Sequence, residues 1–136
     1  TVCEYSDRES IHEDVTYIKP SQMSEHTFDA CISISSYEHD GLGRYGDPLN
    51  PNGDLESMAQ LKSHVKKDGL LYLSVPTGYD KVVFNVHRVY GQHRFPLLIK
   101  DWKLLDIFDV SPSMFSNEFN GIYGSPYQPV FVLSNT

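Results

Sequence analysis

One segment with helical periodicity, placed between two apolar runs, restricts the fold of this chain more than any other feature. Within residues 54–67, apolar side chains recur on one side of a helix, at Leu55, Met58, Leu61 and Val65. Residues 28–36 before it and residues 70–75 after it are apolar runs with the length of a strand. A helix that joins two such strands makes a right-handed crossover, which leaves the strands parallel in one sheet. The sequence therefore predicts an α/β fold.

Both ends of this helix carry residues suited to helix termini. Asp54 suits the N-cap position, and Lys66 and Lys67 suit the negative C-terminal end. Gly69 suits the left-handed residue that closes a helix. We therefore expect the helix to run to Lys67 and the next strand to begin after Gly69.

The rest of the chain predicts shorter elements. Residues 1–5 have the pattern of a strand end, and further strands are expected at residues 15–18, 102–110 and 130–133, with a short helix at 94–100. The link between the last two strands is rich in Ser, Gly, Pro and Asn and has no helical pattern. This favours an antiparallel pair at one sheet edge. The 136 residues fit one domain and exclude two packed ones.

Charge and cysteine content restrict the partners. Eleven Lys and Arg against 18 Asp and Glu give a net charge of −7, which argues against binding to nucleic acid or anionic membranes. No apolar run approaches the roughly 18 residues of a membrane span. Cys3 and Cys31 lie in apolar stretches without the spacing of a zinc site, so we expect no metal. Buried reduced thiols slightly favour a reducing interior such as the cytoplasm.

Gly41 to Gly46 match the G-x-G-x-x-G spacing of a dinucleotide-binding loop. In that motif the last glycine opens a helix whose N-terminus faces pyrophosphate. Asp47-Pro48 and Asn50-Pro51 follow here, which prevents such a helix and places an acidic side chain where phosphate would bind. A nicotinamide-dependent oxidoreductase is therefore a second alternative only.

Two polar clusters follow strand ends, where ligands bind in open α/β sheets. Residues 37–40, Tyr-Glu-His-Asp, come directly after the central strand, and residues 85–90 come after another. His39 or His87 could transfer a proton, and Arg88 could bind an anionic group. The alternative is a solvated strand end and a surface charge cluster without a function.

These segments resemble known families. The strand from Phe28 that ends near His39, followed by the turn Val65-Lys66-Lys67-Asp68-Gly69 and a strand to Pro76, resembles the second half of a class I S-adenosylmethionine-dependent methyltransferase. More narrowly, residues 38–54 and 84–91 resemble two signatures of an uncharacterised family, domain of unknown function 268. The resemblance implies a three-layer, Rossmann-like, mostly parallel sheet with an antiparallel edge pair.

The resemblance also implies a site. S-adenosylmethionine would be held by Glu4, Tyr5, Ser36, Tyr37 and Glu38. Glu4 would accept from the ribose hydroxyls, and Tyr5 would contact the adenine. The acceptor would meet Asp40, Arg44, Tyr45, Asn85, Arg88 and Tyr90. His39 or His87 would act as a general base where the acceptor must lose a proton.

One departure from the methyltransferase pattern affects the whole site. The first strand of that fold and its glycine-rich loop are missing, so we expect residues 1–136 to be a single domain that is incomplete at its N-terminal side. The expected function is methyl transfer from S-adenosylmethionine to a small-molecule or glycan-type acceptor. The first alternative is a non-catalytic module of the same fold that binds a partner or glycan-type ligand through residues 40–53.

Overall fold

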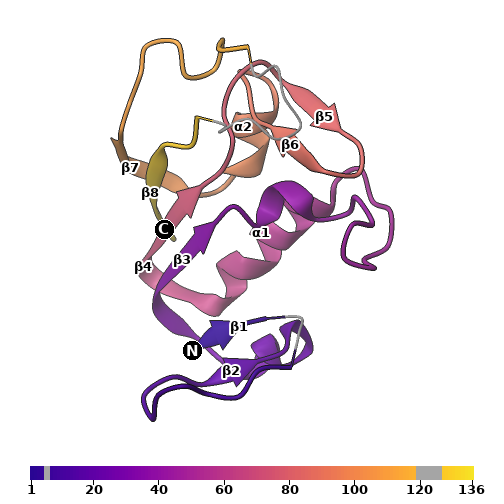
Figure 1. Cartoon of the computed structure of the whole chain (residues 1–136). Helices are drawn as coiled ribbons and strands as arrows, with labels where there is room; N and C mark the ends of the chain where they lie inside the picture. The colour runs from indigo at the N-terminus through magenta and orange to yellow at the C-terminus, as the bar shows by residue number, and fades with distance from the viewer. Residues whose placement is uncertain (5–6, 119–126) are drawn as a thin grey trace.

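A four-stranded mixed sheet forms the centre of the protein (Figure 1). The computed structural model describes residues 1–4, 7–118 and 127–136. The strands lie in the order β3 (Phe28–Ile34), β4 (Val65–Ser74), β8 (Val130–Ser134) and β7 (Lys103–Phe108). β3 and β4 are parallel, whereas β8 is antiparallel to both of its neighbours. The predicted α/β class and antiparallel edge pair are present. The sheet is mixed: β3, β4 and β7 run in the same direction, and β8, which lies between β4 and β7, runs in the opposite direction.

The predicted crossover is formed by α1 (Gly53–His64), which is shorter than expected. β4 begins at Val65 without a loop, and the Asn135 side chain donates to the carbonyl oxygens of Lys62 and Val65. Lys66 pairs with Asp29 at 2.7 Å instead of facing the helix end. A Cβ at Gly69 would lie 2.8 Å from the Asp29 carbonyl oxygen, so this glycine permits close approach between strands.

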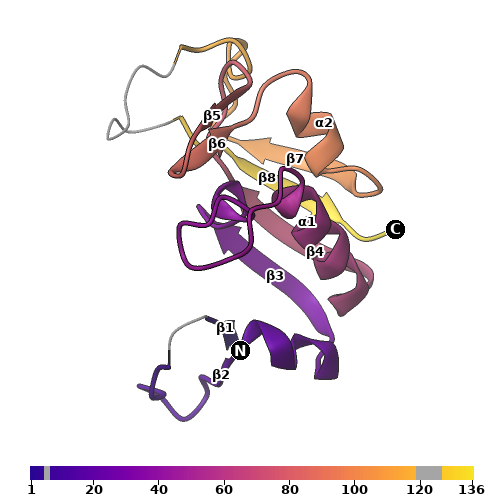
Figure 2. The same ribbon diagram turned by 90° about the vertical axis from the view of Figure 1, so that its right-hand side faces the viewer.

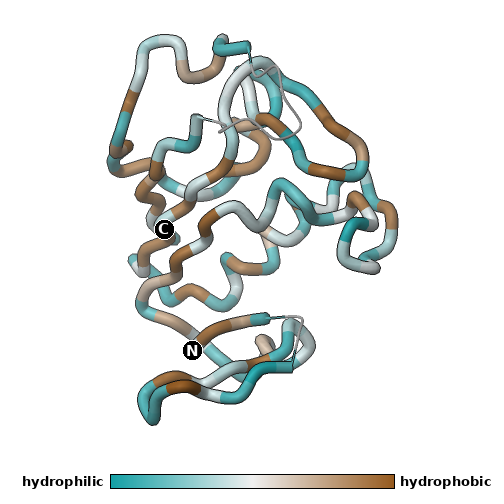
Figure 3. Tube along the Cα trace, in the orientation of Figure 1, coloured by the Kyte–Doolittle hydropathy of each residue, from teal (hydrophilic) through white to brown (hydrophobic). Residues whose placement is uncertain are grey.

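The hydrophobic core lies on one face of the sheet. α1 and α2 (Arg94–Leu98) both cover that face, and both lie in front of the sheet in Figure 2. The core joins inward side chains of both helices and of two strands, β4 and β8, among them Met58, Leu61, Leu71, Leu73, Phe95, Leu98, Phe131 and Leu133. The strands of the sheet carry much of the hydrophobic colouring of the chain in Figure 3. The period-3.6 stripe of the sequence therefore marks the buried side of α1 correctly.

The opposite face of the sheet has no helix over it in the described residues. Ile32 and Ile34 of β3 lie on that face and are 73% and 67% exposed. Their neighbour Cys31 points to the core side, because successive side chains of a strand alternate between faces. The predicted three layers are therefore reduced to two in the part of the chain that the structure describes.

The N-terminal residues form a second, smaller sheet. β1 (Val2–Cys3) and β2 (Tyr17–Ile18) pair in parallel, and a 3₁₀ helix, η1 (Pro20–Glu25), follows. This pair lies beside β3 but does not pair with it (Figures 1 and 2). The described helices include none with the length and apolar character needed to cross a bilayer.

A hairpin that the sequence did not predict lies above the strand ends. It consists of β5 (Lys81–Val83) and β6 (His87–Val89), which pair in antiparallel fashion. The predicted helix at 94–100 is present as α2, and the strand at 102–110 as the slightly shorter β7.

Candidate functional site

The two polar clusters that follow strand ends meet in space. Residues Tyr37–His39 form the 3₁₀ helix η2 directly after β3, and it packs against β6. Nδ1 of His39 lies 2.6 Å from the carbonyl oxygen of Val86, and the Arg44 guanidinium lies 3.4 Å from the same oxygen. A carbonyl oxygen only accepts, so Nδ1 carries the hydrogen in this contact. The ring is therefore fixed with Nε2 facing Glu38, whose Oε1 lies 3.6 Å away.

Asp54 lies at the centre of a buried polar network. Its carboxylate accepts from the Tyr90 hydroxyl at 2.9 Å and from Nε and Nη2 of Arg94 at 2.9 and 2.6 Å. Nε of Arg88 lies 3.6 Å from the same carboxylate. Sequence reasoning placed Asp54 at the N-cap, but Asn52 occupies that position. One signal identifies Asp54 as buried: it precedes Met58 and Leu61 by four and seven residues, which puts it on the core side of α1.

Arg88 fastens the long loop after η2. It is 1% exposed, and it donates to the backbone carbonyl oxygens of Asp40, Asn50 and Pro51 at 2.5, 3.3 and 3.4 Å. The hydroxyl of Tyr90 is likewise used by Asp54. Burial, followed by the Asp54 charge, raises the pKa of Tyr90. Arg88 and Tyr90, two of the predicted substrate-binding residues, are thus enclosed, and Arg88 holds the loop in place.

The glycine-rich loop folds around its own carboxylate. Asp47 accepts the backbone N–H groups of Gly41, Gly43 and Tyr45 at 2.7, 3.3 and 3.2 Å. Burial raises the pKa of Asp47, but these N–H donors outweigh it and the net pKa lies below its ordinary value. The groups that would hold pyrophosphate in a dinucleotide site are therefore already taken. This removes the physical basis of the nicotinamide alternative.

Two acidic side chains near the end of β3 are harder to ionise than usual. Burial raises the pKa of Glu38. The Ser35 hydroxyl, which donates to the carboxylate at 2.5 Å, lowers it by less, so the pKa stays above its ordinary value. Burial also raises the pKa of Asp40; the Ser57 hydroxyl opposes this, while the carboxylates of Asp47 and Asp54 add to it. The strand end is therefore a crowded acidic site.

The remaining predicted residues surround this strand end. His87 is buried, and burial followed by the charges of His39 and Arg44 lowers its pKa, which favours the neutral ring. Asn85 is exposed in the hairpin turn. Tyr45 is 63% exposed, its ring lies edge-on to that of His39, and the Arg44 guanidinium lies 5.7 Å from its centroid.

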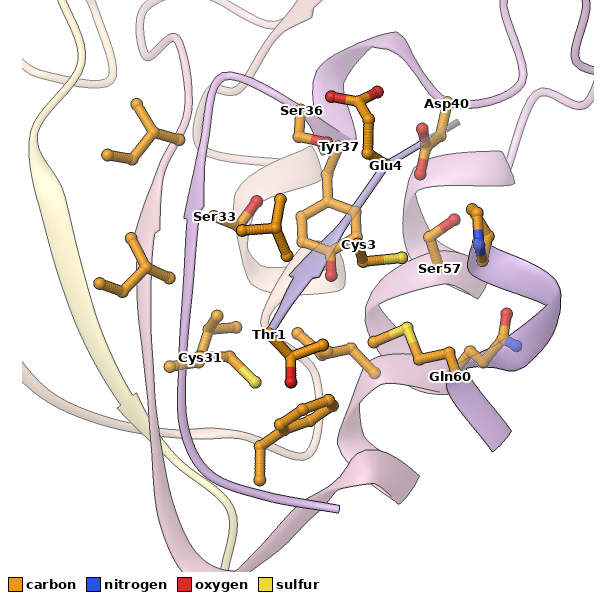
Figure 4. Close-up of a pocket in the computed structure, with 18 of the residues that line it drawn as sticks. Thr1, Cys3, Glu4, Cys31, Ser33, Ser36, Tyr37, Asp40, Ser57 and Gln60 are labelled. Atoms are coloured by element: carbon orange, nitrogen blue, oxygen red, sulfur yellow. The ribbon is translucent and has the colours of Figure 1, made fainter. Parts of the chain in front are cut away.

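A cavity of about 660 Å³ separates β1 from β3 (Figure 4). Its polar end is lined by Glu4 at the end of β1, by Ser36 and Tyr37 after β3, and by Asp40. Three of the predicted cofactor residues therefore share one cavity. Tyr5 lies outside the described residues. Glu38 is fully buried and is not among the residues that line the cavity. No group of three or more metal-ligating side chains is present in residues 1–4, 7–118 and 127–136.

The fold and this site define a class: a mixed α/β protein with a cavity between β1 and β3 whose polar end is lined by residues that follow these two strands. The chain belongs to the family described as "Caenorhabditis protein of unknown function, DUF268", whose model matches residues 2–120. This match confirms the narrower of the two resemblances. No curated protein matches the chain.

Proposed function

We propose that this protein binds S-adenosylmethionine in the cavity between β1 and β3 and transfers its methyl group to a small-molecule or glycan-type acceptor. One observation carries the proposal: Glu4 and the Ser36–Tyr37 segment, from two separate strand ends, line the same cavity. Ligands of open α/β sheets bind outside the carboxyl ends of strands. The cavity volume of about 660 Å³ lies in the usual range for small-ligand sites.

The side chains at this end of the cavity fit the cofactor's chemistry. A carboxylate such as that of Glu4 can accept from two vicinal ribose hydroxyls at once. The acidic surroundings, to which Asp40 contributes, favour a positively charged sulfonium over an anionic ligand. Val2, Pro20 and Met23 offer apolar surface for a purine on the same lining.

Sheet order supports a Rossmann-like methyltransferase architecture as part of this proposal. One edge of the sheet is an antiparallel pair, β8 and β7, as the resemblance to methyltransferases implies. The separation of β1 from β3 matches the place where that fold has its first strand.

S-adenosylmethionine, when bound, supplies an electrophilic methyl group, and the protein's part is mainly to position the reactants. Where the acceptor must lose a proton, His39 is the first candidate base. Its Nδ1–H is fixed on the Val86 carbonyl, which leaves Nε2 as the acceptor nitrogen. His87 is the second candidate, because its lowered pKa favours the neutral ring that a base requires.

Calorimetric titration with S-adenosylhomocysteine tests the proposal. Glu4→Gln keeps the size of the side chain but removes its charge, and should weaken binding about tenfold to a hundredfold. Glu9→Gln, an exposed acidic position nearby, is the matched control and should bind normally. Equal affinity of both variants, or no binding by the unmodified protein, contradicts the proposal.

A specific surface feature favours a second candidate, a binding module without catalysis. The exposed Tyr45 ring, supported by Arg44 and His39, stands on a loop that Arg88 and Asp47 hold firmly. Aromatic faces on rigid loops suit sugar rings. Binding of an oligosaccharide that is lost in Tyr45→Ala, without S-adenosylhomocysteine binding, would favour this candidate.

A further inference from the structure

We propose that the acceptor carries a carboxylate on a sugar ring, and that Arg44 binds this carboxylate where η2, the loop of residues 40–53 and the β5–β6 hairpin meet. We call this place the basic corner, and its residues are His39, Arg44, Tyr45, Lys81 and His87. The inference rests on the proposed function, because it names the class of acceptor. The binding step needs no cofactor, so it can be tested on its own.

The first argument is the charge of Arg44, which has no carboxylate partner in residues 1–4, 7–118 and 127–136. The other three arginines of the chain lie 3.9, 3.6 and 2.6 Å from a carboxylate: Arg8 from Glu4, and Arg88 and Arg94 from Asp54. Arg44 is exposed, and its contacts are the Val86 carbonyl oxygen at 3.4 Å and the ring of Tyr45. Its guanidinium therefore keeps donors for a ligand, in a flat fork that matches a carboxylate.

The second argument is that basic side chains gather at this corner, although the protein carries a net charge of −7. His39 and Arg44 both contact the Val86 carbonyl oxygen, which brings them together on the hairpin. Lys81 lies in β5, which pairs with the strand of His87. Burial lowers the pKa of His87, and the charges of these three basic neighbours lower it further. The local field is therefore positive, and it favours an anionic ligand.

Two acidic side chains near the corner affect which anion fits. Oε1 of Glu38 lies 3.6 Å from Nε2 of His39, and the Asp47 carboxylate accepts the backbone N–H of Tyr45 at 3.2 Å. Repulsion from these groups grows with the charge of the ligand, so a phosphate, with a charge of about −2, is opposed more than a carboxylate. The anion is therefore a carboxylate.

The Tyr45 ring indicates what carries the carboxylate. It is 63% exposed, and the Arg44 guanidinium lies 5.7 Å from its centroid. A ligand whose carboxylate pairs with Arg44 thus has an aromatic surface within reach. The apolar face of a sugar ring packs against such a surface. A hexuronic acid, which carries a carboxylate on a sugar ring, combines both features.

NMR titration of isotope-labelled protein with sodium glucuronate, in the absence of cofactor, tests the proposal. Glucuronate should shift the backbone signals of Arg44 and Tyr45. It should bind about tenfold more tightly than glucose, which has a similar ring without the charge. Its affinity should fall as the salt concentration rises. The Arg44→Gln variant should bind glucuronate about tenfold more weakly and glucose as the unmodified protein does.

The matched control is Lys67→Gln, which removes one positive charge at an exposed position near the start of β4. This variant should bind glucuronate normally. Equal affinity for glucuronate and glucose, no binding of glucuronate, or equal losses in the two variants would overturn the proposal. So would tighter binding of glucose-6-phosphate than of glucuronate. Because the titration contains no cofactor, its failure is distinct from a failure of S-adenosylhomocysteine to bind.

Discussion

Asp54 is the residue on which the polar contacts behind the strand ends converge. Its side chain is fully buried and touches Tyr90, Arg88 and Arg94, two of which carry a positive charge. A buried ion pair adds little net stability over an apolar pair, but removal of one partner leaves the other charge without compensation. Removal of one member of the network should therefore destabilise the protein more than the intact network stabilises it.

The Asp54→Asn variant should lose about 3 to 5 kcal/mol of unfolding free energy, because Arg88 would stay buried without its counter-charge. Urea unfolding followed by circular dichroism measures this. Asp14→Asn, at an exposed position, is the control and should leave the unfolding midpoint unchanged. A loss in Asp54→Asn no larger than that of the control would contradict the role assigned to the network.

The loop between η2 and α1 is an element whose conformation depends on particular glycines. Gly41 and Gly46 both have positive φ, at 78° and 83°. A Cβ at Gly41 would lie 2.1 Å from the Asn50 carbonyl oxygen, whereas a Cβ at Gly46 would meet nothing within 4 Å. The two positions thus share backbone strain and differ in space.

Gly46→Ala should cost about 1 to 2 kcal/mol of unfolding free energy from the left-handed backbone alone. Gly41→Ala should cost clearly more, because the methyl group would also displace Asn50. Comparison of the two variants by thermal and urea unfolding separates the steric part from the backbone part. Equal losses would show that the loop moves aside at Gly41 without cost.

At the level of elements, periodicity predicted more than residue type did. The apolar stripe of residues 55–65 located α1 and its buried side, and the apolar runs located β3 and β4. The end of α1 was misplaced because Lys66 and Gly69 suit a helix terminus locally, while their partner is Asp29, far away in sequence. The β5–β6 hairpin was missed because its strands have three residues each and its turn, Phe84-Asn85-Val86, contains no glycine.

For the site too, the sequence predicted some features of the whole molecule and missed others. Sequence reasoning named residues at strand ends, and the structure brings residues 37–40 and 85–90 together because η2, which follows β3, packs against β6. Sequence reasoning did not predict that Arg88 would be buried, or that the Asp47 carboxylate would accept the backbone N–H groups of the glycine-rich loop. Both depend on contacts between residues whose spacing carries no periodic signal.

The dependence of stability on pH belongs to the whole molecule, and Glu38 offers a test of it. Burial raises the folded-state pKa of Glu38, so between its ordinary pKa and the raised one the folded protein retains a proton that the unfolded chain has lost. The stability that Glu38 contributes is therefore complete below about pH 4.5 and is lost as pH rises through the folded-state value. The Glu38→Gln protein avoids this loss.

The stability advantage of Glu38→Gln over the unmodified protein should be smallest near pH 4 and should grow as pH rises, as measured by urea unfolding across the range. Glu25→Gln, at an exposed position, is the matched control and should show a difference independent of pH. A difference for Glu38→Gln that is flat, or that shrinks with rising pH, would mean that the carboxylate is well solvated in the folded protein.

The carboxylate of Asp47 has a consequence for how the loop meets dissolved anions. It is tied to the backbone groups that it accepts from by a few residues of chain, so it never leaves their vicinity. Short tethers give effective concentrations of roughly millimolar or more. A phosphate compound would have to displace the Asp47 carboxylate, whose effective concentration at these N–H groups does not fall on dilution. The loop thus rejects phosphates by occupancy, with no need for a steric barrier.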